Sequence, residues 1–355
     1  MMRRLVLVCG LLLAAVPAAE AELYTFDAKG VPERVLTIYS SADMDRMVQL
    51  IAAYQAENPG DAVAYHELDT LDLYHRARAD MDGGRPGADL LLSSAMDLQV
   101  KLVNDGYARA HASAATDSLP PWANWRNEAF GFTYEPAVML YNKALAPKLA
   151  EVTTRFELAR HLTFDVGYLR HRVVTYDPER SGLGFLFGTQ DAIRSEDFWY
   201  LARSLGDMEV ALETSSAAMI DKVASGEALL AYNVLGSYAK ARVRDNPDLA
   251  ITIPRDYCLV MSRIAVVARD ARQPQAAGRF IDFLVSRRGQ TLIAGPASLY
   301  AFREDIVGQS TAAGLRAAAQ GPLIPIHLGP GLLVYLDRLK RRVFLDRWRR
   351  AMARE

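Results

Sequence analysis

Short apolar-rich runs alternate with segments of helical periodicity in the first third of the chain. Residues 35–39 (VLTIY), 62–67 (AVAYHE) and 88–92 (ADLLL) are typical of strands, and after each of them apolar residues recur three or four positions apart. Strands that alternate with helices predict an α/β fold, in which a mostly parallel sheet has helices on both faces.

Hydroxyl-bearing residues stand where each strand ends and the next helix begins. They are Ser40, Ser41, Thr70, Ser93 and Ser94. Any one of them alone is typical of a helix cap, whose side chain accepts from a free backbone amide. Because ligands of parallel sheets bind beyond the carboxyl ends of the strands, three such clusters together predict a ligand site at this edge.

Two longer segments combine strand-like apolar runs with a proline and a polar, aromatic patch. They are residues 131–142 (GFTYEPAVMLYN) and 251–268 (ITIPRDYCLVMSRIAVVA). Pro136 lacks a backbone donor, so we expect its strand at a sheet edge or crossing between two bodies. Two crossings predict two lobes, with Tyr134 and Glu135 at the cleft between them. The alternative is two edge strands of one large sheet.

These crossings give an expected division of the chain, whose 355 residues correspond to about two domains. We expect lobe 1 to comprise 32–132 and 262–355, and lobe 2 to comprise 137–254. The hinge crossings are then expected at 133–136 and 255–261.

A glycine-rich loop follows the strand-like run 171–176 in the expected second lobe. Its glycines depart by one residue from the dinucleotide-binding spacing, and no strand-end acid stands where a ribose would need one. Arg180, Ser181 and Gly182 instead predict a cradle for a small anion, with a guanidinium fork, a hydroxyl and a backbone amide as donors. The alternative is a solvated arginine in a capped loop.

Tyr232 and Asn233 end another strand-like run, residues 228–232 (ALLAY). We expect both at the same cleft, where an aromatic ring and an amide can orient a ligand. The alternative is that Tyr232 fills the core of its lobe.

The first 21 residues have the three regions of a secretory signal peptide. Arg3 and Arg4 precede an apolar run over 5–16, and residues 19–21 (AEA) offer the small side chains of a cleavage site. The apolar run is short for a membrane span. We therefore expect export to the periplasm. After cleavage only Cys258 remains, so no intramolecular disulfide is expected.

Charge and motifs argue against several classes of function. The net charge of −1 gives no reason to expect nucleic-acid binding. The sequence contains no G-x-S-x-G, H-E-x-x-H or phosphate-loop motif, and its six histidines show no tight metal-ligand spacing. We therefore expect neither an enzyme nor a bound cofactor or metal.

Five motifs follow one another over nearly the whole mature chain: YSSADM, ADLLLSSAMDL, TYEPAVMLYN, TYDPERSGLGF and GEALLAYNVLGSY. Their order resembles the extracellular solute-binding proteins of bacterial ABC importers, above all the ferric-ion-binding branch. The resemblance implies a two-lobed type II periplasmic fold that closes on a small solute and, as a monomer, delivers it to an inner-membrane permease.

One segment departs from the ferric-binding pattern. Residues 235–238 (LGSY) stand where those members carry two adjacent tyrosines that ligate the metal. Because a ferric ion prefers anionic oxygen ligands, a small anion is the expected solute instead. Two alternatives stay open: a ferric-ion-binding protein of an iron importer, and a periplasmic sensory accessory that presents its ligand to a histidine kinase.

The C-terminal segment from residue 331 is expected to be an amphipathic helix that packs on lobe 1. Leu332, Leu336, Leu339 and Val343 form one apolar stripe, and basic residues cover the opposite face. The alternative is a helix that lies on an anionic membrane or docks on a partner.

Overall fold

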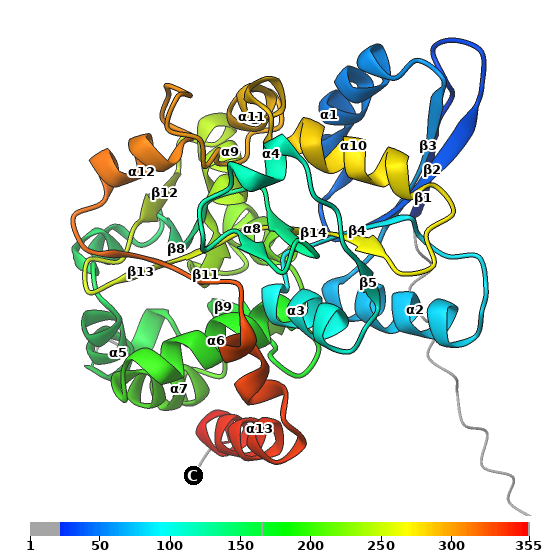
Figure 1. Cartoon of the computed structure of the whole chain (residues 1–355). Coiled ribbons are helices and arrows are strands. Elements are labelled where there is room, and N and C mark those ends of the chain that lie inside the picture. Colours follow the sequence, from blue (N-terminus) through cyan, green and yellow to red (C-terminus); the bar gives the residue numbers. More distant parts are fainter. Residues whose placement is uncertain (1–21, 165, 354–355) are drawn as a thin grey trace, which may run out of the picture.

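The computed structural model describes residues 22–164 and 166–353. The predicted signal peptide, residues 1–21, lies outside the described residues. Two sheets, each flanked by helices, form two lobes (Figure 1). Two separate sheets rule out the alternative of one large sheet. Among the described residues, no helix combines the length and the apolar character that crossing a bilayer requires.

The first sheet is the framework of lobe 1. Its order is β1-β3-β2-β4-β14-β7-β6, and β5 pairs with β14. β2 is parallel to β3 and β4, whereas β1 and β14 are antiparallel to their neighbours, so the sheet is mixed and not mostly parallel as expected. The strands are β1 (Glu22–Phe26), β2 (Arg34–Ser40), β3 (Asp61–Glu67), β4 (Leu90–Ser93), β5 (Ala108–Arg109), β6 (Asn124–Trp125), β7 (Ala129–Gly131) and β14 (Ile264–Ala268).

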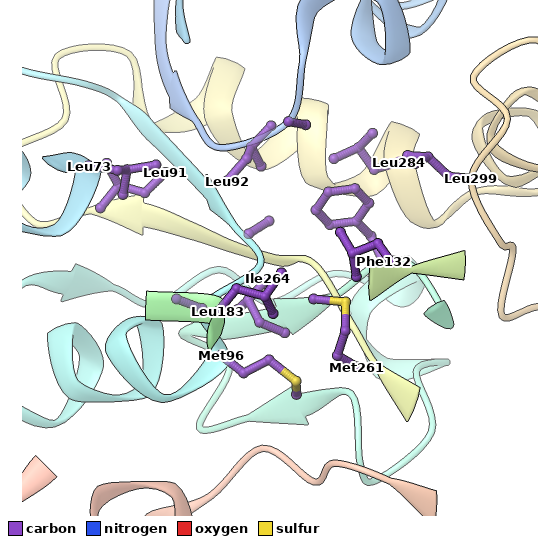
Figure 2. Packing of buried hydrophobic residues seen from close by; sticks show 14 of the residues in the cluster. Leu73, Leu91, Leu92, Met96, Phe132, Leu183, Met261, Ile264, Leu284 and Leu299 are labelled. Atoms are coloured by element: carbon purple, nitrogen blue, oxygen red, sulfur yellow. The ribbon is translucent and has the colours of Figure 1, made fainter. Parts of the chain in front are cut away.

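Helices bury both faces of this sheet. Tyr54 of α1 has no exposed surface and its ring lies 4.8 Å from the ring of Phe280 in α10, which fixes the two helices together. Figure 2 shows Leu183 of lobe 2 in the same cluster as Met96 and Ile264, so the main core continues across the boundary between the lobes. The helices are α1 (Met44–Glu57), α2 (Thr70–Asp82), α3 (Met96–Asn104), α4 (Ala114–Asp117), α10 (Pro274–Val285) and α11 (Arg287–Ala294).

The second sheet is the framework of lobe 2. Its order is β10-β9-β11-β8-β13-β15, and β12 pairs with β8. The strands are β8 (Glu135–Asn142), β9 (Val173–Tyr176), β10 (Ala211–Glu213), β11 (Leu230–Leu235), β12 (Leu249–Thr252), β13 (Cys258–Met261) and β15 (Leu323–Pro325). Its helical elements are η1 (Pro147–Glu151), α5 (Arg155–Phe164), η2 (Val166–Tyr168), α6 (Gly182–Arg194), α7 (Asp197–Asp207), α8 (Ser216–Ser225), α9 (Gly236–Asp245) and α12 (Ala312–Ala318).

β8 is a central strand, so of the two places expected for it, a sheet edge and a crossing between two bodies, the sheet edge was wrong. All eight of its residues are buried between β11 and β13. Pro136 is tolerated because it is the second residue of the strand, where the ladder with β13 covers only two residue pairs.

The chain passes between the two sheets twice, and the return lies later than the hinge expected at 255–261, because residues 258–261 form β13 of the second sheet. It leaves β7 of the first sheet for β8 of the second, and it returns from β13 to β14. The two passages lie side by side, since Glu135 pairs with Met261 and Pro136 with Val260. Arg263 Nε donates to Glu135 Oε1 at 2.8 Å, which adds a buried ion pair across the passages.

The C-terminal segment does not follow the expected division. β15 pairs with β13 in the second sheet, and η3 (Pro330–Leu336) then packs against α3 of lobe 1. The last helix, α13 (Arg338–Met352), packs against α7 of lobe 2 and lies at the lower edge of Figure 1. Assigning all of 262–355 to lobe 1 therefore needs correction.

The apolar stripe expected on the C-terminal helix also needs correction. Leu339 and Val343 are exposed, whereas Phe344 and Trp348 are buried against α6 and α7. The prediction assumed one continuous helix from residue 331. Asp337 instead separates a 3₁₀ helix from an α-helix, so the residues before and after it do not share one helical face.

Candidate functional site

A cavity of about 330 Å³ lies between the two lobes. Lobe 1 supplies the ends of β2 and β3 and the starts of the helices that follow them, and lobe 2 supplies the ends of β9 and β11 and the start of α8. The lining residues are Glu22, Ser41, Asp43, Glu67, Leu68, Asp69, Thr70, Ser94, Tyr176, Leu183, Thr214, Ser215, Ser216, Ala217, Leu235, Tyr238 and Arg263.

Direct hydrogen bonds join the lobes beside this cavity. The amide of Gly182 donates to Thr70 Oγ1 at 3.0 Å, and the amide of Asp43 donates to the Tyr238 hydroxyl at 3.3 Å. A Cβ at Gly182 would lie 2.8 Å from Leu98 Cδ1. The lobes are therefore in close contact in this conformation, and the glycine permits that approach.

Three of the five hydroxyl residues predicted at the strand ends line the cavity. Ser41 and Ser94 are adjacent, since the Ser94 amide donates to Ser41 Oγ at 3.1 Å, and Thr70 forms the contact between the lobes. Ser40 and Ser93 are buried behind the cavity. Their hydroxyls accept from the amides two residues further on, so they stabilise the turns into the helices.

The predicted anion cradle does not form in this conformation. Arg180 is exposed and does not line the cavity. The Ser181 hydroxyl caps α6 by accepting from the Gly184 amide at 3.1 Å, and the Gly182 amide is bound to Thr70. Because the Gly182 amide is already bound and the Ser181 hydroxyl serves as a helix cap, the capped-loop alternative describes this segment.

Tyr232 and Asn233 lie inside lobe 2 and not at the cleft, because β11 continues to Leu235. Both side chains donate to Asp191 Oδ2, at 2.8 and 2.7 Å, and Arg155 Nε donates to the Tyr232 hydroxyl at 2.8 Å. This buried network fits the alternative in which Tyr232 fills the core.

Tyr134 and Glu135 hold the passages between the lobes and do not line the cavity. Tyr134 packs against Trp122, with ring centroids 5.6 Å apart. Glu135 is fully buried and accepts hydrogen bonds from Arg263 and Ser237. Their role in this conformation is structural.

The charged lining residues are mostly acidic. Asp43, Glu67 and Asp69 line the lobe 1 side, and burial is the main cause that raises the pKa of each carboxyl. Within the described part of the chain, no ion pair joins these three to a lysine, arginine or histidine. All three stand at the same strand ends and helix starts as the predicted hydroxyl residues, and this position is the sequence signal that could have found them.

Among the residues that the structure describes, Arg263 is the one basic residue that lines the cavity. Its side chain is buried, Nε binds Glu135, and Nη1 contacts the Ser41 carbonyl at 3.5 Å. Nη2 has no hydrogen-bond partner among the described residues. An arginine alone in the apolar run CLVMSRIAVVA was the sequence signal, because a buried arginine needs a partner or a ligand.

Two tyrosines that sequence reasoning missed complete the lining. Burial raises the pKa of both the Tyr176 and the Tyr238 hydroxyl, so each stays protonated at neutral pH. The Tyr176 hydroxyl contacts Ser216 Oγ at 2.6 Å. In the described residues, no group of three or more histidine, cysteine, aspartate or glutamate side chains could hold a metal ion.

Residues 36–295 match the bacterial extracellular solute-binding proteins, and the chain belongs to this family. The substrate binding protein of an ABC transporter from Agrobacterium tumefaciens is similar in sequence and structure. The identity is 37%, the match covers 95% of this chain and 100% of that chain, and the TM-score is 0.89. The predicted α/β class, two-lobed type II periplasmic fold and relation to ABC transporters are thereby confirmed. No curated protein matches the chain.

Two further structures are similar in fold alone. Iron-bound HitA from Pseudomonas aeruginosa has 18% identity and a TM-score of 0.70, over 90% of this chain and 100% of that one. AfuA from Actinobacillus pleuropneumoniae, with fructose-6-phosphate bound, has 14% identity and a TM-score of 0.70, over 90% and 99%. The fold therefore accompanies chemically different ligands, and the ligand must be argued from the cavity.

Proposed function

We propose that this protein captures a small solute in the cavity between its lobes and delivers it to the permease of an ABC importer. The observation that carries the proposal is a polar cavity lined from both lobes, beside which the lobes bond directly to each other. A solute that contacts both walls binds the closed form best, so it shifts the population toward closure. The permease then distinguishes loaded from empty protein by shape.

The cellular setting follows from the sequence. A signal peptide over residues 1–21 would export the chain, and the mature protein would act in the periplasm as a monomer that binds but does not transform its solute. A sensory accessory that presents its closed lobes to a histidine kinase would use the same closure. Whether the loaded protein retains a permease or a kinase in a pull-down experiment decides between the two roles.

Several lining residues bear on the charge of the solute. The free Nη2 of Arg263 supports the anionic group expected from the sequence. Iron is a second candidate, because Tyr176 and Tyr238 line the cavity together with carboxylates. The two tyrosines are far apart in the sequence, unlike the adjacent pair of the ferric-binding pattern, and this argues against iron.

A thermal-shift screen of the mature chain tests the proposal. Carboxylates, phosphate, phosphonates, polyols, amines and ferric salts would be added separately. One class should raise the melting temperature in a saturable way. At a concentration 100 times its dissociation constant, the ligand should add about 2.7 kcal/mol to the free energy of unfolding.

Matched variants locate the binding site. Ser41→Ala and Ser94→Ala should weaken the shift because both side chains line the cavity, whereas Ser225→Ala, at the exposed end of α8, should leave it unchanged. The proposal fails if no solute class stabilises the protein, or if the cavity variants respond like wild type.

A further inference from the structure

We propose that the solute carries an ammonium group, held by Asp43 and Glu67, and an oxygen acceptor next to it, held by Arg263 Nη2. This inference rests on the proposed function, because it specifies the solute of the same cavity. It differs from the simple anion that the sequence suggested.

Carboxylates define the lobe 1 side of the cavity. Glu22, Asp43, Glu67 and Asp69 all line it. The charges of Arg263 and Arg46 offset part of the charge of Asp43, whereas no ion pair among the described residues reaches Glu67. Glu67 Oε2 accepts from the Met44 amide at 2.8 Å, and its second oxygen accepts no hydrogen bond from the described residues. A partly buried carboxylate without a cation is unfavourable, so this wall favours a positively charged group from outside.

The carboxylates also act on one another. The charges of Asp43, Glu22 and Asp45 each raise the pKa of Glu67, in addition to its burial. Like charges that perturb one another in this way lie close together, so the potential at this end is negative. A phosphate or a carboxylate placed there would be repelled, whereas an ammonium would be attracted.

Arg263 is the second, independent observation. It is 1% exposed, it lines the cavity, and its Nη2 has no partner among the described residues. A buried donor without an acceptor is unfavourable, so the solute is expected to supply an oxygen. Because Glu135 already neutralises the guanidinium, this oxygen can belong to a hydroxyl or to an acidic group.

The size of the cavity and the chemistry of its lining residues restrict the class of solute. The cavity of about 330 Å³ is at the small end for organic ligands. The described residues hold no group of three or more histidine, cysteine, aspartate or glutamate side chains that could bind a metal ion. An amino acid and an amino alcohol or amino sugar share the required chemistry, and they differ in whether the acceptor is charged.

Matched probes test the amine. We would compare 4-aminobutanoate with butanoate, ethanolamine with ethylene glycol, and glucosamine with glucose, by thermal shift and isothermal titration calorimetry on the mature protein. At least one amine should raise the melting temperature while its partner without the amine does not. Binding of 4-aminobutanoate would indicate that the acceptor on the solute is an acidic group. Binding of ethanolamine or glucosamine would indicate that it is a hydroxyl.

Variants tie the effect to the named carboxylates. Asp43→Asn and Glu67→Gln keep the size and an acceptor oxygen of each side chain, and each should weaken binding of the amine at least tenfold. Asp245→Asn removes an exposed carboxylate at the end of α9 and should change nothing.

The outcomes separate the two proposals. The inference is overturned if phosphate or a carboxylate stabilises the protein and no amine does, or if the amine binds equally well to Glu67→Gln and wild type. In both cases the proposed function stands. If neither these probes nor any class in the broader screen stabilises the protein, the proposed function fails together with the inference.

Discussion

Replacing Thr70 by valine should weaken solute binding while both lobes stay folded. Thr70 Oγ1 accepts from the Gly182 amide at 3.0 Å, and this bond joins α2 of lobe 1 to α6 of lobe 2. Valine has nearly the shape of threonine but no hydroxyl. In the closed form the Gly182 amide would lose its acceptor, whereas in an open form water would bind it. The change therefore destabilises the closed form alone.

The size of this effect follows from the energy of hydrogen bonds. Loss of the bond and of solvation for a buried amide costs about 1 to 2 kcal/mol. Because a solute that favours the closed form must also supply this energy, its dissociation constant should rise about 5- to 30-fold. Most of the change should appear as faster release.

Two further variants separate closure from direct contact with the solute. Thr70→Ser retains the hydroxyl and should bind like wild type. Gly182→Ala places a Cβ 2.8 Å from Leu98 Cδ1 of lobe 1, so it should also hinder closure and weaken binding. Because Gly182 does not line the cavity, this loss cannot come from direct contact with the solute. Isothermal titration calorimetry with the solute found by the screen measures all three. A dissociation constant unchanged in Thr70→Val would refute the reasoning.

Three other predictions concern stability. Burial raises the pKa of Asp97 from 3.8 to about 7, so the folded protein binds a proton more tightly than the unfolded chain and gains stability as the pH falls through 7. Asp97→Asn should therefore be more stable than wild type in urea at pH 8, by up to roughly 4 kcal/mol, and this advantage should shrink by pH 5; an equal advantage at both pH values would contradict the assignment. Trp348→Ala removes a buried ring that stacks on Phe198, 6.3 Å between centroids, and should cost about 3–5 kcal/mol in thermal unfolding and expose α13 to proteases. Glu135→Gln removes the carboxylate that pairs with the buried Arg263 and should cost about 3–5 kcal/mol, whereas adding Arg263→Met should restore most of the loss; a double variant no better than the single one would contradict this.

Local sequence pattern predicted most of the elements but not how they associate. The strands expected over 35–39, 62–67 and 88–92 are present as β2, β3 and β4, since an apolar run before a segment of helical spacing defines each of them locally. β1 was missed, although it pairs with β3 over five residues. The sheet edge suggested by Pro136 was wrong, because whether a strand is central depends on partners that are distant in the sequence.

Site residues were predictable where a strand end and a helix start coincide. Ser41, Thr70 and Ser94 line the cavity for that reason. Tyr232 was misplaced because β11 runs three residues past it. Arg263 and Tyr238 reach the cavity only through the packing of one lobe on the other, which local pattern does not contain.

The connection at Asp337 restricts how the lobes can separate. η3 is held by lobe 1 and α13 by lobe 2, and this single residue lies between them. One residue spans at most about 3.6 Å, so the lobes cannot slide apart at this point. Unless α13 detaches, release of the solute requires a swing about an axis that passes near Asp337. Shortening or lengthening this joint would then change the range of the swing without altering a single contact to the cargo.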